Sequence, residues 1–445
     1  MTAAPIADLL RDALPEATVL TDDGVDGYEV SGLRPAAVVH VNTPEQVAVV
    51  LNLAGEQGWA VAPRGGGTML DLGNPLARLD LVLDLSGLDT VIDYQPDDLT
   101  LTVQAGITVA AVERLLEQRG QMLALDVPLP VQATIGGALA TNAFGPRRLR
   151  YGTARDLVIG MKAALPSEGL VRSGGKVVKN VAGFDLAKLH IGGLGTAGVI
   201  TEVTFKLWPA PPARGALVAV FGSCEAAFAA ARELLRSQLF PAAVELAGPP
   251  ASERLLPATG AEATPGGWLL AILFLGVAEA VRRQTRAATD VCTGTGSAGV
   301  ATFEQPQDQR PFDRVRDYGR SAEHPTNLIL RANVLPADTA KAIRIIEDAV
   351  GPLGSPAGII AQPGSGVVRA HWPAAPADAV AETVRRLRDA LRPLGGLMVE
   401  RAPAGSLGNL DAWGLNGPDL ALMRKLKQTY DSAGILNPGR YVGRL

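Results

Sequence analysis

The chain has 445 residues, which is long enough for two or three domains. Hydrophobic residues make up 47% of it and charged residues 19%, a composition typical of a globular protein with a large core. The 41 basic and 45 acidic residues give a net charge of −4 and predict no basic surface, which disfavours nucleic acid as a partner.

Cysteine and histidine usage argues against a metal centre. The two cysteines, Cys224 and Cys292, are too few for a disulfide framework or for an iron–sulfur cluster held by four thiolates. The four histidines lie far apart in the sequence and lack the spacing of zinc ligands. We therefore expect no bound metal.

No segment has the composition of a membrane anchor. The most apolar run, residues 268–278, is well short of the roughly 20 residues that cross a bilayer and predicts a buried strand. The N-terminal residues include Asp8, Arg11 and Asp12 and lack an apolar stretch, so we expect no signal peptide. The expected location is the cytoplasm, with any membrane association made through partners.

The first half alternates between predicted strands and helices. Thr43, Pro44 and Gln46 have the pattern of a capping box and predict a helix that stops at Gly58. Thr108 is placed to cap a second helix, and a short third helix is expected at residues 185–190. Strands are expected at residues 38–41, 59–62, 81–85, 99–104, 156–164, 170–172 and 199–207.

The second half has a different character, and Pro209, Pro211 and Pro212 mark the predicted boundary. Apolar strands near Trp268 and Leu328 alternate with helical patterns, which predicts an α+β domain with helices packed on a sheet. The predicted helices cover residues 225–236, 279–291, 339–350, 377–391 and 422–430. We therefore expect one domain at residues 1–210, another at 211–420, and a C-terminal helix and tail at 421–445.

A run of three glycines directly follows a predicted strand, where open α/β folds place ligand loops. Gly65, Gly66 and Gly67 let the backbone come close to a ligand, and successive N–H groups in such a turn can form a nest for an anion. A tight turn is the alternative, although it would usually need only one or two glycines. The run therefore favours an anion-binding loop.

Three further segments of the first half contain closely spaced glycines. Residues 133–143 combine small side chains with hydroxyl and amide groups, which suits either a helix start pressed against a cofactor or simple close packing. Gly193, Gly195 and Gly198 match G-x-G-x-x-G, but a helix precedes them and a strand follows, the reverse of a Rossmann loop. The sequence around Lys176 lacks the first glycine of a P-loop, so ATP or GTP is not expected.

Taken in order, four segments resemble the FAD-linked oxidases of the vanillyl-alcohol oxidase and p-cresol methylhydroxylase type. They are residues 63–68, 133–143, 174–186 and 193–201, and residues 436–440 agree with the family's C-terminal signature. The resemblance is strong over residues 30–210 and in the tail. It implies an α+β protein with a two-part α/β FAD-binding domain, an α+β cap domain, and a tail that returns to the FAD domain.

The resemblance also implies which residues hold FAD. Residues 64–68 would cradle the diphosphate through backbone N–H groups. Residues 134–137, with Thr141 and Asn142, would line the pyrophosphate and flavin, and residues 195–200 would run along the ribityl and adenine side. Family members with covalent flavin often carry the attaching histidine at the position of Thr68, so noncovalent FAD is expected. The candidate FAD-binding residues are Pro63, Arg64, Gly65, Gly66, Gly67, Thr68, Pro128, Thr134, Ile135, Gly136, Gly137, Thr141, Asn142, Gly195, Gly198, Val199 and Ile200.

Oxidation of a 2-hydroxy acid needs a cation for the carboxylate and a base for the hydroxyl proton, while the flavin takes a hydride. Catalytic relatives carry a histidine-containing signature where this chain has residues 362–372, which offer only Arg369 and His371. These two are the catalytic candidates, although a lone histidine among apolar residues is also typical of a structural role. Arg331 and His324 are weaker candidates.

The family includes FAD-binding subunits of glycolate oxidase complexes, and the resemblance implies that this chain is such a subunit. It would oxidise glycolate to glyoxylate, and electrons would pass to a second flavoprotein subunit and an iron–sulfur subunit. Two alternatives remain open. One is a self-sufficient FAD-dependent 2-hydroxy acid dehydrogenase of the D-lactate type, and the other is a scaffold subunit that keeps the fold without useful flavin chemistry.

Overall fold

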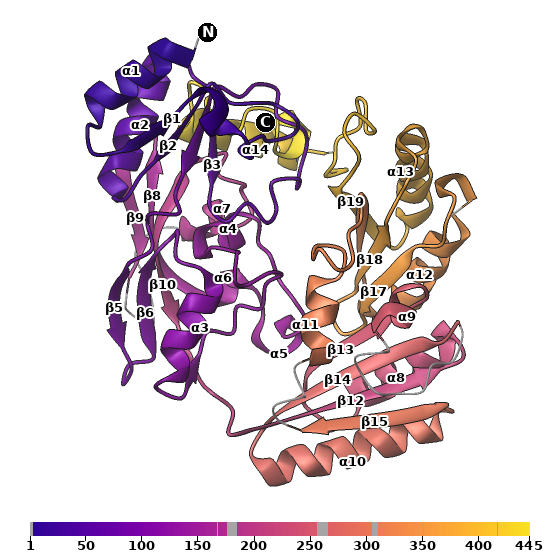
Figure 1. The fold of residues 1–445 in the computed structure, drawn as a ribbon. Coiled ribbons are helices and arrows are strands. Elements are labelled where there is room, and N and C mark those ends of the chain that lie inside the picture. Colours follow the sequence, from indigo (N-terminus) through magenta and orange to yellow (C-terminus); the bar gives the residue numbers. More distant parts are fainter. Residues whose placement is uncertain are drawn as a thin grey trace. The chain divides into compact units, whose positions relative to one another are not determined.

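The computed structural model describes residues 3–166, 168–175, 185–255, 266–304, 310–349, 351–415 and 417–445, which form two compact units (Figure 1). Unit 1 comprises Met1–Phe144, Thr153–Ala210 and Leu415–Leu445, and unit 2 comprises Gly145–Gly152 and Pro211–Gly414. Most of the family-like segment at 174–186 lies outside the described residues.

Two boundaries of these units differ from those expected from the sequence. Gly145–Gly152 belongs to unit 2, because helix α5 (Arg148–Tyr151) packs on strand β13 (Pro241–Ala247) and Arg150 Nη1 donates to the Leu275 carbonyl at 2.8 Å. The segment that returns to unit 1 begins at Leu415.

The first sheet of unit 1 has the strand order β1-β2-β4-β3, and its last three strands run parallel. The strands are β1 (Thr18–Leu20), β2 (Ala37–His40), β3 (Val61–Arg64) and β4 (Leu81–Asp84). Helices α1 (Ala3–Ala13) and α2 (Pro44–Gln57) contribute apolar side chains to the core beneath this sheet. The predicted capping box of α2 is confirmed, because Gln46 N–H donates to Thr43 Oγ1 at 3.2 Å and Thr43 N–H donates to Gln46 Oε1 at 3.3 Å.

Strand β3 extends further toward the glycine run than the sequence suggests. Pro63 and Arg64, which we expected in the loop, pair in parallel with Leu83 and Asp84 of β4. The tail pairs with the other edge of β3, where Val61 N–H donates to the Ile435 carbonyl at 2.8 Å and Asn437 N–H donates to the Val61 carbonyl at 2.9 Å. The glycine loop therefore starts from a strand that is held on both sides.

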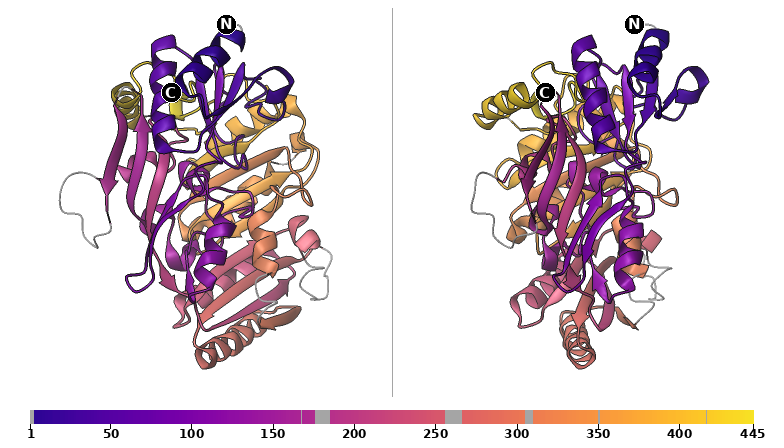
Figure 2. Two further views of the ribbon diagram at one scale, coloured as in Figure 1. Left: turned by 60° about the vertical axis from the view of Figure 1, so that its left-hand side comes forward. Right: turned by 90° about the vertical axis from the view of Figure 1, so that its left-hand side faces the viewer.

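The second sheet of unit 1 is antiparallel, with the order β5-β6-β10-β8-β9. Its strands are β5 (Val91–Gln95), β6 (Thr100–Gln104), β8 (Val158–Leu165), β9 (Gly169–Gly174) and β10 (Val199–Lys206). The remaining short elements are η1 (Asp22–Val25), α3 (Val109–Glu117), β7 (Gln121–Met122), α4 (Ile135–Ala140), α6 (Ala154–Leu157), α7 (Ala187–His190) and β11 (Trp208–Pro209). The C-terminal helix α14 (Asp419–Tyr430) lies at the same end of unit 1 as α1 and α2 (Figure 2).

Unit 2 is built on one antiparallel sheet of order β15-β12-β14-β13-β17-β18-β16-β19. Apart from β13, its strands are β12 (Ala213–Phe221), β14 (Trp268–Gly276), β15 (Gly299–Glu304), β16 (Leu328–Val334), β17 (Gly358–Gln362), β18 (Val367–Trp372) and β19 (Gly395–Arg401). Its helices are α8 (Cys224–Arg236), α9 (Ala251–Leu255), α10 (Ala278–Gly294), α11 (Arg310–Asp317), α12 (Thr339–Asp348) and α13 (Ala377–Leu391). The predicted combination of a sheet with packed helices is confirmed.

The core of unit 2 occupies one face of this sheet. Alternate residues of the strands, among them Leu270, Leu330 and Ala370, join apolar side chains of α8, α10, α12 and α13 in one buried cluster. Because side chains alternate along a strand, Arg331, Arg369 and Glu400 lie on the opposite face. That face therefore carries three charged side chains of the sheet.

Replacing Thr43 by alanine tests the α2 capping box. The change removes the acceptor for the Gln46 N–H group, so we expect the free energy of unfolding in urea to fall by about 1 kcal/mol. Thr429→Ala, within the exposed part of α14, is the matched control and should not lower it. An equal loss in both variants would mean that the cap does not stabilise α2.

Candidate functional site

The glycine loop after β3 runs directly against the segment that leads into α4. A Cβ atom on Gly65 would overlap the Thr134 hydroxyl, and one on Gly66 would overlap the backbone carbonyl of Gln132. Gly67 has a φ of +70°, a conformation that favours glycine. The close approach of two backbones therefore requires glycine here, and it leaves the loop's N–H groups unshielded by side chains.

Arg64 lies at the start of this loop, with its guanidinium stacked 4.2 Å from the centre of the Tyr28 ring. Tyr28 Oη lies 3.4 Å from His40 Nε2, and His40 Nδ1 lies 3.5 Å from Asp84 Oδ2. Within the described residues, the buried Arg64 Nε has no hydrogen-bond partner. A cation held by stacking, with a donor still unused, suits an anionic ligand.

The second predicted segment forms the start of α4. Thr134 caps the helix by accepting a hydrogen bond from Gly137 N–H at 3.3 Å. Gly136 N–H donates to the Ala105 carbonyl at 2.7 Å, and a Cβ atom on Gly136 would lie 2.7 Å from the Ala105 methyl group. Ile135 is fully buried. Gly136 and Ile135 therefore position the helix, whereas Thr134 and Gly137 are open to the adjoining groove.

The predicted segment at residues 193–201 packs beside the strand that leads into the glycine loop. Gly195 has a φ of +67°, and a Cβ atom on it would lie 3.3 Å from Pro63 Cγ. The loop is also tied to α4, because Leu194 N–H donates to the Ala140 carbonyl at 2.9 Å. Val199 and Ile200 are buried, and a Cβ atom on Gly198 would clash with Leu165 and His190. We infer that these last three residues support the loop.

These three segments meet at one groove in unit 1. The groove is lined by Pro63, Arg64, Gly65, Gly66, Gly67, Thr68, Met69, Leu70, Thr134, Gly137, Ala140, Thr141, Leu194 and Arg440. Of the other predicted residues, Asn142 follows α4 with a φ of +47°, and the half-buried Pro128 is not among the lining residues. Most residues that line the groove were therefore predicted from the sequence. Those not predicted are Met69, Leu70, Ala140, Leu194 and Arg440.

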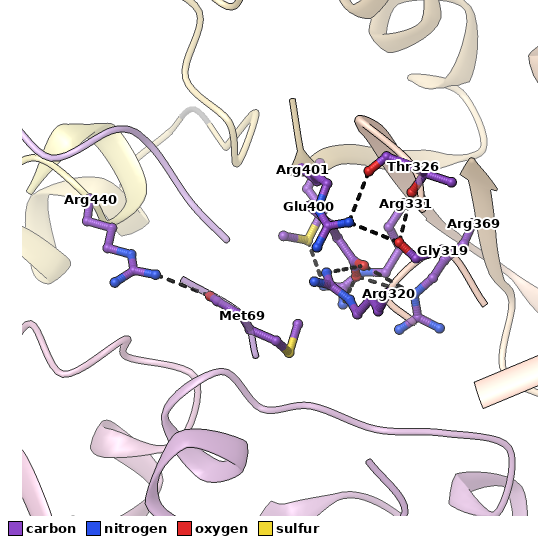
Figure 3. Close-up of polar contacts among 10 residues, drawn as sticks. Met69, Gly319, Arg320, Thr326, Arg331, Arg369, Glu400, Arg401 and Arg440 are labelled. Carbon is purple, nitrogen blue, oxygen red and sulfur yellow. Dashed lines mark hydrogen bonds and ion pairs between the residues drawn. The ribbon is translucent and has the colours of Figure 1, made fainter. Parts of the chain in front are cut away.

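Arg440 is the most informative of the missed residues. Its buried guanidinium donates to the Met69 carbonyl at 3.2 Å (Figure 3). It also donates to the carbonyls of Leu70 at 2.7 Å and Leu72 at 3.1 Å. Burial lowers its pKa to about 10, so the group remains charged at neutral pH. The signal was present in the C-terminal signature at residues 436–440, to which the sequence analysis gave no site role.

Unit 2 contains a second polar centre, on the sheet face opposite its core (Figure 3). Glu400 Oε1 lies 2.9 Å from Arg331 Nη1, and Glu400 Oε2 lies 3.4 Å from Arg320 Nη2 and from Arg369 Nε. We call these four residues the arginine cluster. A register shift in β19 leaves Glu400 as the extra residue opposite Ile329 and Leu330, which aims its side chain at the three guanidinium groups.

The residues of the arginine cluster differ in their exposure and in their pKa shifts. The Glu400 side chain is 3% exposed, whereas those of Arg331 and Arg369 are 19% and 18% exposed. Burial opposes ionisation of Glu400, but Arg369, Arg331 and Arg320 outweigh it and hold the pKa of this carboxyl well below its usual range. Burial lowers the pKa of Arg331 to about 10, and repulsion from Arg369 and Arg148 adds to this while Glu400 opposes it. Three cations therefore share one carboxylate.

His371 does not suit the role of general base that the sequence suggested. Its ring is buried against Tyr318, with the ring centres 5.1 Å apart, and neither ring nitrogen has a hydrogen-bond partner within the described residues. Burial, reinforced by Arg369, lowers its pKa to about 3, so the ring is a weak base. His324 also stacks on Tyr318, with ring centres 5.4 Å apart. Arg331, ranked below His371 from the sequence, is instead a central member of the arginine cluster.

Comparison with known families identifies the fold and cofactor. Residues 35–174 match the family described as FAD binding domain, and residues 210–401 and 412–441 match the family described as FAD linked oxidases, C-terminal domain. The chain belongs to the FAD-linked oxidase family. FAD is accordingly its cofactor, and the protein is an oxidoreductase.

Several relatives of this FAD-linked oxidase carry functional names. A protein named D-2-hydroxyglutarate dehydrogenase from Xanthomonas citri pv. viticola is 30% identical over 92% of this chain and 89% of its own length. A protein named glycolate oxidase subunit GlcD from Bacillus subtilis is 29% identical over 71% of this chain and 68% of its own. A protein named D-lactate dehydrogenase from Archaeoglobus fulgidus is 28% identical over 92% of this chain and 91% of its own.

A solved structure supports the fold independently. The crystal structure of p-cresol methylhydroxylase with substrate bound has a TM-score of 0.76 and is 19% identical, covering 98% of this chain and 96% of that one. At this identity the likeness concerns the fold alone. It confirms the predicted α+β FAD-binding fold of this FAD-linked oxidase.

The groove in unit 1 fits FAD on its own geometry. The glycine loop leaves no room for side chains and exposes backbone N–H groups, and Arg64 adds a cation with an unused donor. We therefore propose that the loop holds the diphosphate of FAD, with Thr134, Gly137 and Thr141 also lining the groove.

The described part of the chain was also searched for metal ligands, reactive thiols and membrane-spanning helices. It contains no group of three histidine, cysteine, aspartate or glutamate residues placed to hold a metal ion. Cys224 and Cys292 are buried, which raises the pKa of each thiol to about 12. None of the helices described is both long and apolar enough to span a membrane.

Replacing Gly66 by alanine tests the proposed cradle. The new methyl group would overlap the Gln132 carbonyl, so the loop must move and its N–H groups must turn away from the diphosphate. We expect the ratio of flavin to protein absorbance to fall severalfold in purified Gly66→Ala. Gly55→Ala, at a position in α2 with open space around it, is the matched control and should keep its flavin. Full flavin content in Gly66→Ala would show that this loop does not bind FAD.

Acid precipitation tests the expectation of noncovalent FAD. Thr68 stands where covalent relatives often carry the attaching histidine, and a threonine hydroxyl does not form such a bond. The flavin absorbance should move entirely to the supernatant. Colour retained in the washed pellet would show a covalent attachment.

Proposed function

We propose that this protein is the FAD-binding subunit of a complex that oxidises glycolate or a similar 2-hydroxy acid and passes the electrons to partner subunits. The observation that carries the substrate class is the arginine cluster of unit 2, where three guanidinium groups share the Glu400 carboxylate. The names of several relatives, which refer to glycolate, D-lactate and D-2-hydroxyglutarate, support the same class.

The arginine cluster suits a carboxylate ligand. Arg331 and Arg369 are paired across neighbouring strands and retain partial exposure, so their guanidinium groups can reach an anion from the sheet face. Guanidinium groups bind carboxylates through two parallel hydrogen bonds. Arg320, whose side chain is only 5% exposed, is better placed to hold Glu400 than to meet a ligand. We assign substrate binding to Arg331 and Arg369.

Oxidation of a 2-hydroxy acid removes a hydride from the α-carbon and a proton from the hydroxyl group. When bound, FAD supplies the acceptor for the hydride. The arginines fix the carboxylate and so orient the α-carbon, which is how binding energy lowers the barrier. The arginines hold the pKa of the Glu400 carboxyl well below its usual range, so Glu400 is too weak a base to take the hydroxyl proton, and His371 is too weak a base and too enclosed to do so.

The proposed partners are a second flavoprotein subunit and an iron–sulfur subunit. The two cysteines of this chain cannot hold a cluster, because a cluster needs four thiolates and both cysteines are buried with raised pKa values. Electrons must therefore leave FAD for an acceptor outside the chain. We expect the complex in the cytoplasm or at a membrane surface reached through the partners.

A self-sufficient 2-hydroxy acid dehydrogenase is the second candidate. The relative named D-2-hydroxyglutarate dehydrogenase, whose name does not refer to a subunit, aligns over 92% of this chain. The arginine cluster would serve either candidate, so substrate binding does not separate them.

Replacing Arg331 or Arg369 by methionine tests the substrate site. Each change removes a charged hydrogen-bond donor, so we expect kcat/KM for the 2-hydroxy acid to fall about 10- to 100-fold. Arg282→Met, at an exposed position on α10, is the matched control. Turnover is measured in preparations that retain the co-purifying subunits, and flavin content should be unchanged. Normal kcat/KM in both variants would remove the arginine cluster from the site.

Anaerobic mixing of the isolated chain with glycolate, D-lactate or D-2-hydroxyglutarate separates the two candidates. If a partner completes the proton-accepting machinery, each acid should bleach the flavin slowly or incompletely. Rapid and complete bleaching by one acid would instead establish a self-sufficient dehydrogenase.

A further inference from the structure

A half-buried lysine joins the C-terminal helix to the loop at residues 192–198. Lys427, on α14, donates from Nζ to the Thr196 carbonyl at 2.8 Å, to the Leu436 carbonyl at 2.7 Å and to Asp431 Oδ2 at 2.6 Å. These three acceptors use all three donors of the ammonium group. One side chain thus connects α14 and the tail that follows it to a loop 231 residues earlier in the sequence.

The charge of Lys427 is balanced locally and held in a defined place. The Asp431 side chain is fully buried, and its two oxygens also accept the N–H groups of Ile435 and Leu436, at 3.1 and 2.9 Å. Burial lowers the pKa of Lys427, while Asp431 opposes this shift. Because burying a lone ammonium group is unfavourable, its placement here indicates a specific structural or functional demand.

Core packing of α14 does not explain this lysine. No residue of α14 is fully buried, so the helix has little apolar surface that needs a deep anchor. Helix length and propensity would be served equally by a surface residue such as Lys425 on the same helix. The contacts of Lys427 point instead to the 192–198 loop and the tail.

The 192–198 loop is a wall of the proposed FAD groove. Gly195 lies against Pro63, Leu194 lines the groove, and Asn437 Nδ2 donates to the Leu194 carbonyl at 2.6 Å. Thr196 Oγ1 donates to the Gly193 carbonyl at 2.6 Å and keeps the loop compact. Lys427 and Asn437 therefore hold neighbouring carbonyls of the loop from the tail side.

We propose that Lys427 is a positioning residue for FAD: it fixes the 192–198 loop in the conformation that binds the cofactor. This inference rests on the proposed placement of FAD in the groove of unit 1. It gives the tail a role in cofactor affinity that is separate from its role in the fold.

The test compares cofactor affinity with the stability of the apoprotein. Lys427→Met should weaken FAD binding at least tenfold, measured by titrating the apoprotein and following flavin fluorescence, because it removes two bonds from a charged donor to the loop and tail. The apoprotein's melting temperature should change little by comparison. Lys427→Arg should restore part of the affinity, since it keeps the charge and the donors. Lys425→Met is the matched control and should bind FAD normally.

A double variant controls for misfolding caused by an unpaired buried carboxylate. Lys427→Met with Asp431→Asn removes both charges, so no carboxylate is left buried without its counter-ion, and it should show the same loss of FAD affinity. Unchanged affinity in Lys427→Met or in the double variant would overturn the proposal. So would a fall in apoprotein melting temperature that accounts for the whole loss, without rescue by arginine.

Gly195→Ala separates failure of this proposal from failure of the proposed site. A methyl group at Gly195 would press on Pro63 at a positive φ, so it perturbs the loop independently of Lys427. If Gly195→Ala loses FAD and Lys427→Met does not, the positioning role is wrong and the site stands. If neither variant loses FAD, the loop is not part of the site and both proposals fail.

Discussion

The close approach of the glycine loop to residues 132–134 is the constraint on which unit 1 depends. Gly65 and Gly66 have no space for a side chain, because the Thr134 hydroxyl and the Gln132 carbonyl occupy it. This contact holds only if β3 is fixed, and β3 is paired with β4 on one side and with the tail on the other. The parallel sheet, the start of α4 and the C-terminal tail therefore form together the proposed cofactor site, although they come from distant parts of the sequence.

The buried carboxylates Asp431 in unit 1 and Glu400 in unit 2 have different sets of cationic partners. In unit 1, Lys427 and Asp431 neutralise each other, and their remaining contacts are with backbone groups. In unit 2, one carboxylate is shared by three guanidinium groups, and two of the three retain partial exposure. A balanced pair can serve positioning alone, whereas guanidinium groups that retain partial exposure can also meet a bound anion. This difference is why we assign cofactor positioning to the first and substrate binding to the second.

Local sequence signals predicted the elements and the cofactor loops well. The capping box of α2, the strand β10 and the glycine loop depend on residues close together in the chain, and each was placed within a few residues. The family resemblance added the cofactor. What local signals could not supply was pairing between distant segments. The end of β3 shifted because β4 pairs with Pro63 and Arg64, and Gly145–Gly152 joined unit 2 because α5 packs on β13.

The arginine cluster shows the same limit at the level of function. Alternation along β18 predicts that Arg369 and His371 share a face, but the sequence does not reveal that β16 lies beside β18, which places Arg331 opposite Arg369. Nor does it reveal the register shift that turns Glu400 toward both. Once the strands are placed, the roles of the candidates change: His371 is enclosed against Tyr318 with a pKa near 3, whereas Arg331 is held by Glu400. The proposed substrate site of this FAD-linked oxidase therefore depends on strand order in unit 2, and not on a histidine motif in the sequence.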